Sequence, residues 1–392
     1  MRRDSSPSGP ALPLPRAAAT LPAVAESSTD ILGLESQELA ELASRVLRAG
    51  SGVAGRLYAQ SYREGALAPE GLGLSSASEA AWRERFGLRL LDLVRLARDE
   101  SGGDPTEKAV LGLADGATVE CVRIPMPGGD GRKSTLCVSS QVGCRMGCAF
   151  CETGRAGLER NLKAAEIVGQ VLTARLRLGW ECGNVVFMGM GECLDNLGEV
   201  ARAIRVLGDR RGLGYAQERL SLCTSGPAGA IEALRELGLK RLNLSVSLNA
   251  ANDEKRSALM PVNRGNGLEA LAASLAAYPM RRNFALGVNW CLIPGLNDSR
   301  EDAREAAAFC ARAGRTGRCI VNLIPYNPGS SPIARAPRED ELDRFSSWLE
   351  DEGCLVKRRA TKGGSIMAGC GQLGGPCASG YSVSDRDEAG RA

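Results

Sequence analysis

The stretch GCRMGCAFCETG, residues 143–154, holds the cysteines Cys144, Cys148 and Cys151 in a C-x3-C-x2-C spacing. A structural zinc site needs four protein ligands, usually supplied as two separated pairs. This stretch has no second C-x2-C pair. A [4Fe–4S] cluster held by three cysteines would instead leave one iron free for a cofactor or a substrate. The spacing therefore predicts a cluster with an open iron; zinc, or thiols that only pack in a core, is the alternative.

The chain has 392 residues and no histidine, which narrows the chemistry further. Histidine is the usual acid–base group near neutral pH and the commonest metal ligand. Histidine-dependent triads, H-E-x-x-H zinc sites and Cys2His2 fingers are therefore excluded. Any catalysis must use cysteine, carboxylates, lysine or a cofactor.

The composition is that of a globular protein, with 44% hydrophobic and 24% charged residues. No run of eighteen apolar residues predicts a membrane span. Prolines interrupt residues 1–29, which lack the apolar core of a signal peptide, so we expect a disordered tail and a cytoplasmic protein. The fourteen cysteines are spread along a long chain, which favours metal or redox chemistry for the clustered ones. The net charge of +3 neither requires nor excludes a nucleic-acid partner.

Apolar periodicity divides the rest of the chain into two regions. Residues 30–105 have a helical pattern that we extend through SEAAWRERFGLRLLDLVRLAR, and they predict a small helical N-terminal domain. From residue 106 to 377, strand-like runs alternate with helical runs, which predicts an α/β fold with a parallel sheet and right-handed crossovers. Residues 378–392 are polar and are expected to form a second disordered tail.

Small or polar residues follow the predicted strands of this α/β region. The cysteine loop is one such strand end. Others are MGMGE up to residue 192, CTSG up to 226, SLN up to 249 and PYN up to 327. In parallel α/β folds ligands bind at the carboxyl ends of the strands. We therefore expect these five ends to meet at one site.

Several stretches together resemble the RlmN/Cfr family of radical S-adenosylmethionine (SAM) RNA methyltransferases. They are TLCVSSQVGCRMGCAFCETG, RNLKAAEIVGQV, VVFMGMGE, LMPVNR, GLNDS, VNLIPYNP and CGQL, in this order between about residue 117 and residue 373. The resemblance implies a partial (β/α)6 radical-SAM barrel in residues 106–377, with residues 30–105 as a helical accessory domain. It also implies a [4Fe–4S] cluster on Cys144, Cys148 and Cys151, with SAM on the open iron.

The same resemblance implies three catalytic residues. Cys370 would receive a methyl group from SAM, and the carbon of that group would then add as a radical to an adenine ring. Cys137 would resolve the protein–RNA adduct by forming a disulfide with Cys370. Glu120 would handle the proton. Radical addition suits the reaction because the adenine carbon is not a nucleophile, and the glycines around Cys370 would let its loop move at low steric cost.

The resemblance also implies the residues that contact SAM, and among them Glu192 can accept hydrogen bonds from the SAM ammonium. The full set is Gly191, Glu192, Cys223, Ser225, Ser247, Leu248, Asn249 and Asn327. The chain departs from the family pattern in having Cys193 for a proline, Asn249 for a histidine and Cys223 for a serine. Asparagine can donate and accept hydrogen bonds but cannot titrate. Either Cys223 or Ser225 could be the residue that approaches SAM.

The implied substrates are adenines of 23S rRNA and tRNA, with methylation at carbon 2 as in RlmN or at carbon 8 as in Cfr. We favour carbon 2. The basic segment VKRRATKGG, residues 356–364, lies just before Cys370, where RNA would have to approach. An electron donor such as flavodoxin or ferredoxin, a monomeric state and no membrane contact are also expected. The alternatives are a radical-SAM enzyme with another substrate, or a non-catalytic Fe–S or zinc RNA-binding module.

Overall fold

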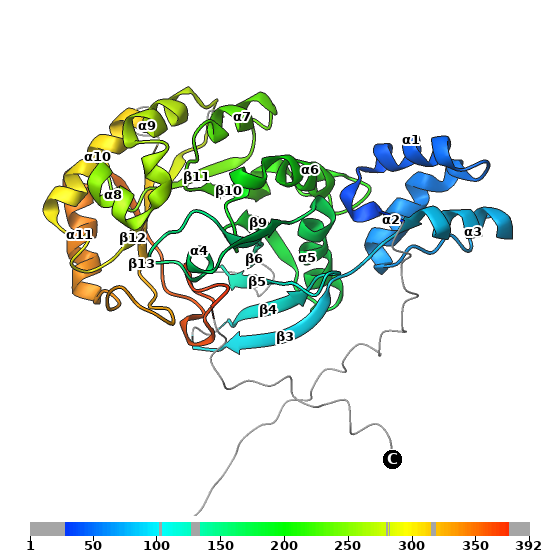
Figure 1. Cartoon of the computed structure of the whole chain (residues 1–392), viewed down its shortest axis with the longest axis horizontal. Coiled ribbons are helices and arrows are strands. Elements are labelled where there is room, and N and C mark those ends of the chain that lie inside the picture. Colours follow the sequence, from blue (N-terminus) through cyan, green and yellow to red (C-terminus); the bar gives the residue numbers. More distant parts are fainter. Residues whose placement is uncertain are drawn as a thin grey trace, which may run out of the picture.

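The computed structural model describes residues 28–101, 104–126, 134–279, 281, 283–314 and 319–375. A ten-stranded sheet in the order β14-β13-β12-β11-β10-β9-β6-β5-β4-β3 curves through these residues, and helices cover its outer face (Figure 1). Of the predicted tails at residues 1–29 and 378–392, residues 1–27 and 378–392 lie outside the described residues, whereas Thr29 forms a short strand with Asp30.

Seven neighbouring strands of the sheet are parallel to one another and form the barrel. They are β6 (Ser134–Cys137), β9 (Cys182–Phe187), β10 (Leu220–Thr224), β11 (Asn243–Ser247), β12 (Leu286–Leu292), β13 (Cys319–Pro325) and β14 (Leu355–Arg358). The first six alternate with helices along the chain. The predicted α/β class with a partial (β/α)6 barrel is therefore confirmed, and β14 extends that barrel by one strand.

The outer helices connect successive strands of the barrel. They are α5 (Ala164–Leu176), α6 (Leu197–Gly208), α7 (Ala230–Glu236), α8 (Asp253–Leu259), α9 (Leu268–Ala277), α10 (Arg300–Ala313) and α11 (Glu339–Asp351). Their starts have local causes. At α10, for example, the Ser299 hydroxyl accepts from the Asp302 N–H, while Asp302 accepts from the Ser299 N–H.

Three antiparallel strands extend the sheet beyond β6. They are β5 (Thr118–Pro125), β4 (Thr106–Gly112) and β3 (Asp92–Asp99). A two-stranded sheet of β7 (Gln141–Cys144) and β8 (Gly157–Asn161) brackets the short helix α4 (Glu152–Ala156).

The N-terminal helices project from one end of the barrel (Figure 1). They are α1 (Ser36–Val46), α2 (Ala54–Glu64) and α3 (Ser76–Arg85), and the short strands β1 (Thr29–Asp30) and β2 (Phe86–Gly87) pair beside them. The helical pattern predicted beyond Arg85 is wrong, because residues 92–99 form β3. That strand pairs along its whole length with β4, and this long-range pairing overrides the local helical pattern.

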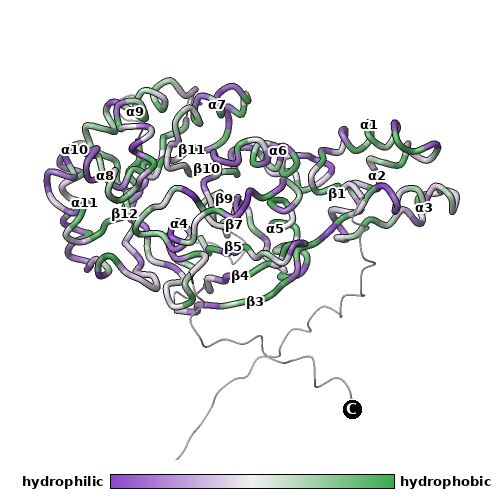
Figure 2. The backbone as a smooth tube through the Cα atoms, in the orientation of Figure 1, coloured by the Kyte–Doolittle hydropathy of each residue, from purple (hydrophilic) through white to green (hydrophobic). Residues whose placement is uncertain are grey.

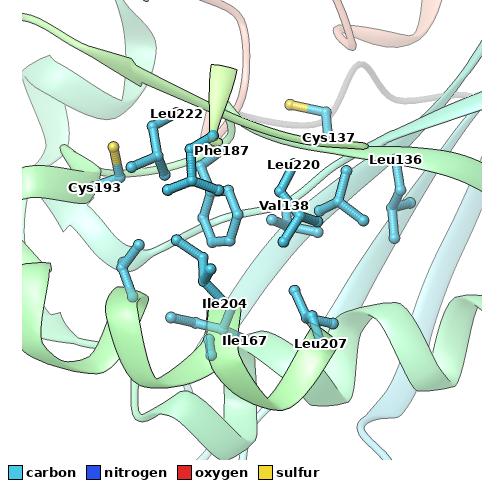
Figure 3. Packing of buried hydrophobic residues seen from close by; sticks show 14 of the residues in the cluster. Leu136, Cys137, Val138, Ile167, Phe187, Cys193, Ile204, Leu207, Leu220 and Leu222 are labelled. Carbon is cyan, nitrogen blue, oxygen red and sulfur yellow. The ribbon is translucent and has the colours of Figure 1, made fainter. Parts of the chain in front are cut away.

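Alternating side chains on the barrel strands separate the core from the site. On β10, Leu220 and Leu222 are buried against the helices. Ser221 and Cys223, which alternate with them, face the other side of the sheet. Figure 3 shows these leucines packed with Ile167, Ile204 and Leu207, whereas the sulfur of Cys137 points away from that layer. Figure 2 shows hydrophobic and hydrophilic segments interspersed along the backbone. Among the described residues, no helix is both long and apolar enough to cross a membrane.

Candidate active site

One cavity lies at the carboxyl ends of the central barrel strands and collects most of the predicted site residues. From the predicted set, its lining contains Cys144, Cys148, Cys151, Gly191, Glu192, Cys223, Ser225, Ser247, Asn249 and Cys370. Apolar side chains complete the wall: Met146, Phe150, Phe187, Met188, Met260 and Ile324. Polar strand ends facing an apolar wall suit a ligand with a charged end and a flat ring.

The three loop cysteines face this cavity from the hairpin and helix that follow β6. Cys144 ends β7, and Cys151 is the N-cap of α4. The Cys151 N–H donates to the Cys148 carbonyl over 3.1 Å, which makes a tight turn between the two thiols. Burial raises the pKa of Cys144 to about 12 and also raises those of Cys148 and Cys151. Neutral thiols in a buried loop would ionise on binding iron, so this donor set fits a cluster.

Glu192 joins two strand ends beside the cysteine loop. One of its oxygens accepts from the Ser225 N–H at 2.7 Å and the Ser225 hydroxyl at 2.8 Å, and the other accepts from the Leu194 N–H at 3.0 Å. Burial raises its pKa, and the hydrogen bonds from Ser225 and Leu194 oppose that rise. Gly191 has φ +101°, and an added Cβ would lie 2.6 Å from Gln141, so only glycine fits before Glu192.

Two of the three departures from the family pattern, Cys223 and Asn249, line the same cavity, whereas Cys193 is buried outside its lining. The Cys223 sulfur lies 3.4 Å from the Ser247 hydroxyl and accepts from the Asn289 amide at 3.0 Å. Asn249 has φ +58°, a left-handed conformation that asparagine tolerates better than most residues. Its side-chain amide oxygen, Oδ1, accepts from the Cys291 N–H at 2.8 Å. Both Cys223 and Ser225 line the cavity, but Ser225 is the one bound to Glu192.

Two predicted SAM contacts are not brought to this cavity. Leu248 is fully buried behind the wall, where its N–H donates to Asn289 and its carbonyl accepts from Arg256. Asn327 lies instead beside the Cys370 loop, because its amide donates to the Cys370 carbonyl at 3.3 Å. The PYN strand end therefore holds the loop that carries Cys370, and four of the five predicted strand ends meet at the cavity.

Cys370 is exposed and lines two cavities at once. One is the cavity of the cysteine loop, and the other, of about 400 Å³, opens between β5, β13 and the segment after β14. The second cavity carries Lys357, Arg359 and Lys362. Burial of the sulfur among neighbouring atoms raises the pKa of Cys370 to about 11, and the charge of Arg359 opposes this rise. The thiol is thus placed between an apolar, acidic cavity and a basic one.

The other two predicted catalytic residues lie outside the first cavity. Cys137 is buried at the end of β6, and its pKa is raised, first by burial and then by the nearby Cys370 thiol. Glu120 is buried on β5, where it pairs with Lys108 over 3.2 Å and accepts from the Gly374 N–H at 3.0 Å. The Cys370 thiol is therefore near enough to raise the pKa of Cys137, whereas Glu120 reaches only the end of the Cys370 loop.

Sequence reasoning missed residues of β12 and of the segment after β11. Asn289 and Cys291, at alternate positions of β12, line the first cavity, as does Met260. An asparagine inside an otherwise apolar strand was the signal that could have identified Asn289. Arg256 is fully buried, and its guanidinium donates to the carbonyls of Ser225, Ser247 and Leu248, which fixes two strand ends together. Burial lowers the pKa of Arg256 to about 10.

Comparisons with known proteins agree with this architecture. A sequence model of the radical SAM superfamily matches residues 138–309. A dual-specificity RNA methyltransferase RlmN of Syntrophotalea carbinolica is 44% identical over 277 residues, which cover 70% of this chain and 71% of that protein. A probable dual-specificity RNA methyltransferase RlmN 1 of Protochlamydia amoebophila is 37% identical over 347 residues, covering 88% and 93%.

A solved structure agrees as well. The crystal structure of a radical SAM methyltransferase from Sphaerobacter thermophilus superimposes with a TM-score of 0.79 at 33% identity, over 88% of this chain and 98% of that one. The chain therefore belongs to the RlmN/Cfr family of radical-SAM RNA methyltransferases, most like RlmN, whose cofactors are a [4Fe–4S] cluster and SAM.

Proposed function

We propose that this enzyme methylates carbon 2 of adenine in 23S rRNA and in tRNA, with Cys370 as the carrier of the methyl group. The observation that carries the proposal is the position of Cys370, an exposed residue that lines both cavities. A group on its sulfur can receive a methyl from one cavity and deliver it to a base in the other. Carbon 8 of adenine is the alternative target.

In the proposed reaction Cys144, Cys148 and Cys151 would hold the cluster, and Glu192 would accept hydrogen bonds from the ammonium of SAM. When bound, the cluster and SAM supply the methyl group and the one-electron chemistry that makes its carbon reactive. Apolar side chains such as Phe150 and Met260 cover this cavity and exclude water from it.

The second cavity supports an RNA substrate. Arg359 is exposed, and its guanidinium donates two hydrogen bonds to the side-chain amide oxygen of Asn322, at 3.2 and 2.8 Å. Lys362 donates to the Pro125 carbonyl at 2.7 Å. A volume of about 400 Å³ lies within the roughly 300–1,000 Å³ of small-molecule pockets, so one nucleotide fits. Cations at its rim would contact the neighbouring phosphates.

Cys137 and Glu120 would complete the turnover. The Cys137 thiolate attacks the sulfur of Cys370, so that an S–S bond forms and the bond between that sulfur and the transferred carbon breaks. The electron pair stays on the carbon, which takes up a proton and becomes the new methyl group. Before this attack, Glu120 would accept the proton that leaves the adenine carbon of the radical adduct, and the unpaired electron would return to the cluster that had supplied an electron to SAM. A thiol reductant must then reduce the disulfide between Cys137 and Cys370 before the next cycle.

Glu120 would have to change partners for this role, since both of its oxygens are engaged in the structure. The external electron donor, flavodoxin or ferredoxin, and the monomeric state remain part of the proposal. So do the domain boundaries, with residues 30–105 as the accessory domain and 106–377 as the catalytic core. Within residues 30–105, β3 pairs with β4 of the core sheet, whereas β2 pairs with β1.

The test is to treat a 23S rRNA fragment and a tRNA with the anaerobically reconstituted enzyme, a reductant and SAM. Nucleosides from the digested RNA are then separated and compared with 2-methyladenosine and 8-methyladenosine. We expect 2-methyladenosine, together with one added methyl, about 14 Da, on Cys370 of the enzyme. Cys370→Ala should give neither product. Methylated RNA formed by that variant would refute Cys370 as the carrier, and 8-methyladenosine would refute the assignment of carbon 2.

A further inference from the structure

Lys108 is a buried lysine with two hydrogen-bond acceptors. Its side chain, on β4, is 3% exposed. The ammonium donates to one carboxylate oxygen of Glu120 at 3.2 Å and to the carbonyl of Met367 at 3.1 Å. Burying an ammonium is costly unless it is paired and hydrogen-bonded, so these two contacts hold the lysine in one place.

The second oxygen of Glu120 extends this arrangement to another point on the same loop. It accepts from the N–H of Gly374 at 3.0 Å. Met367 and Gly374 are the two ends of a segment that carries Cys370 near its middle. Lys108 and Glu120 therefore hold both ends of residues 367–374, and we name this pair the clasp.

Both ends of the segment have left-handed backbone conformations, which glycine adopts freely but methionine does not. Met367 has φ +53° and Gly374 has φ +77°. A left-handed conformation is unfavourable for a side chain such as methionine, and it persists where surrounding contacts enforce it. The Met367 carbonyl is the acceptor for Lys108, so the clasp acts at the strained residue itself.

The middle of the segment is held by other groups. The Glu152 N–H donates to the Gly371 carbonyl at 2.7 Å, and the Thr153 hydroxyl donates to the Leu373 carbonyl at 2.5 Å. These contacts attach the segment to the cysteine loop. The Asn327 amide attaches the Cys370 carbonyl to the end of β13, and the clasp attaches both ends of the segment to β4 and β5. The position of the Cys370 thiol between the two cavities depends on all three attachments.

We infer that Lys108 is a positioning residue for methyl transfer: with Glu120 it fixes both ends of the Cys370 loop and so sets the place of the reactive thiol. The inference rests on the proposed role of Cys370, but the clasp itself can be tested without methyl transfer. Removing the Lys108 ammonium should release the Met367 carbonyl and weaken the hold on Gly374 through Glu120.

The experiment measures the alkylation of Cys370 by iodoacetamide in the cluster-loaded enzyme under anaerobic conditions. In Lys108→Met, the rate of Cys370 alkylation should rise at least about tenfold, because the hydrogen bonds of the Lys108 ammonium to Glu120 and to the Met367 carbonyl are lost. Buried Cys310 should stay as protected as in the unsubstituted enzyme. Formation of 5′-deoxyadenosine from SAM should change less than about twofold, while Cys370 methylation falls at least about tenfold. Lys108→Arg, which keeps the charge, should restore much of the methylation.

The matched control is Lys255→Met. Lys255 also pairs with a buried carboxylate, Asp302, at 2.7 Å, but it lies on α8, away from the Cys370 loop. This variant should leave Cys370 alkylation unchanged. A Cys370 rate in Lys108→Met equal to that of the unsubstituted enzyme would overturn the inference. An equal rise at Cys310 would also overturn it, because that would indicate a general loss of structure.

A measurement on the unsubstituted enzyme covers the case in which Lys108→Met does not fold. The clasp requires the Gly374 amide to be protected from hydrogen exchange, and rapid exchange at Gly374 would overturn the inference. If Cys370 of the unsubstituted enzyme is never methylated, the proposed function fails, while the alkylation and exchange results still decide whether the clasp exists.

Discussion

The backbone N–H of Glu152 donates to the carbonyl of Gly371 over 2.7 Å. Glu152 directly follows the cysteine Cys151, and Gly371 directly follows Cys370. One backbone hydrogen bond therefore joins the loop that would bind the cluster to the loop that carries Cys370, the thiol proposed to accept the methyl group. Two segments more than two hundred residues apart in the sequence thus form one wall of the cavity.

The first prediction concerns the cluster. Replacing Cys144 by alanine leaves two thiol ligands, so the cluster and the cleavage of SAM should both be lost. We expect 5′-deoxyadenosine formation to fall by more than about 100-fold, since even outer-shell changes at metal sites cost roughly 10–100-fold. Iron, sulfide and 5′-deoxyadenosine are measured after anaerobic reconstitution. Cys182→Ala, at the far end of β9, should retain all three; retained SAM cleavage in Cys144→Ala would contradict the assignment.

The second prediction concerns the resolving thiol. Cys137 is buried beside Cys370 at the end of β6. Without its sulfur the adduct between Cys370 and RNA has no attacking group, so Cys137→Ala should accumulate a covalent protein–RNA species. The species is detected as a slower band on a denaturing gel that nuclease treatment removes. Cys121→Ala, a buried cysteine on β5, is the control. Normal multiple turnover by Cys137→Ala would show that another group resolves the adduct.

The third prediction concerns SAM binding. Gln cannot replace Glu192, because a side-chain amide would present N–H groups to the donors of Ser225 or Leu194 and lacks the charge for an ammonium. The dissociation constant of SAM for Glu192→Gln should rise roughly 10–100-fold. Calorimetric titration of the cluster-loaded enzyme measures it. Glu232→Gln on α7 is the control and should leave the affinity unchanged. An unchanged SAM affinity in Glu192→Gln would show that Glu192 does not bind the SAM ammonium.

The same residue sets a pH dependence for SAM binding. Burial raises the pKa of Glu192 above its usual value of 4.5, and only the ionised carboxylate attracts the ammonium. As the pH falls, SAM affinity should weaken through this raised pKa, at a higher pH than for an ordinary carboxylate. The loss should be absent in Glu192→Gln, whose affinity is already low. A parallel pH profile in both proteins would assign the titration to another group.

The fourth prediction concerns stability in the N-terminal region. Burial raises the pKa of Asp30 from 3.8 to about 6, although the Leu32 N–H donates to its carboxylate at 2.9 Å. A raised carboxyl pKa stabilises the fold at pH below the unfolded value, and that contribution is lost as pH rises through about 6. Asp30→Asn removes the buried charge and can still accept from Leu32.

Asp30→Asn should therefore stabilise the protein at pH 7.5 by up to about 3 kcal/mol, and by little near pH 4.5. Urea unfolding of both proteins at the two pH values, followed by circular dichroism, measures the difference. Equal destabilisation at both values would show that the carboxylate is needed for its hydrogen bonds rather than penalised by its burial.

Much of the architecture could be predicted from local patterns in the sequence. The alternation of strand-like and helical runs after residue 106 predicted the parallel α/β sheet, because backbone geometry repeats every two residues in strands and about every 3.6 in helices. The resemblance to the family added the barrel. The cysteine spacing and the polar strand ends predicted the cavity, since the carboxyl ends of parallel strands share one edge. The pattern failed at residues 92–99, where pairing with β4 decided the structure.

The tertiary structure alone decided where the residues that follow β11 lie relative to the cavity. It placed Asn289 in the cavity wall, left Leu248 behind that wall, and set Asn327 against the Cys370 loop. It also brought the Lys108 ammonium, which pairs with Glu120, to the Met367 carbonyl. Lys108 and Met367 are 259 positions apart in the sequence. Spacing along a chain specifies which groups share a loop or one face of a strand. Contacts between distant segments depend on how the sheet curves and on which loops pack over its edge, and no local repeat encodes them.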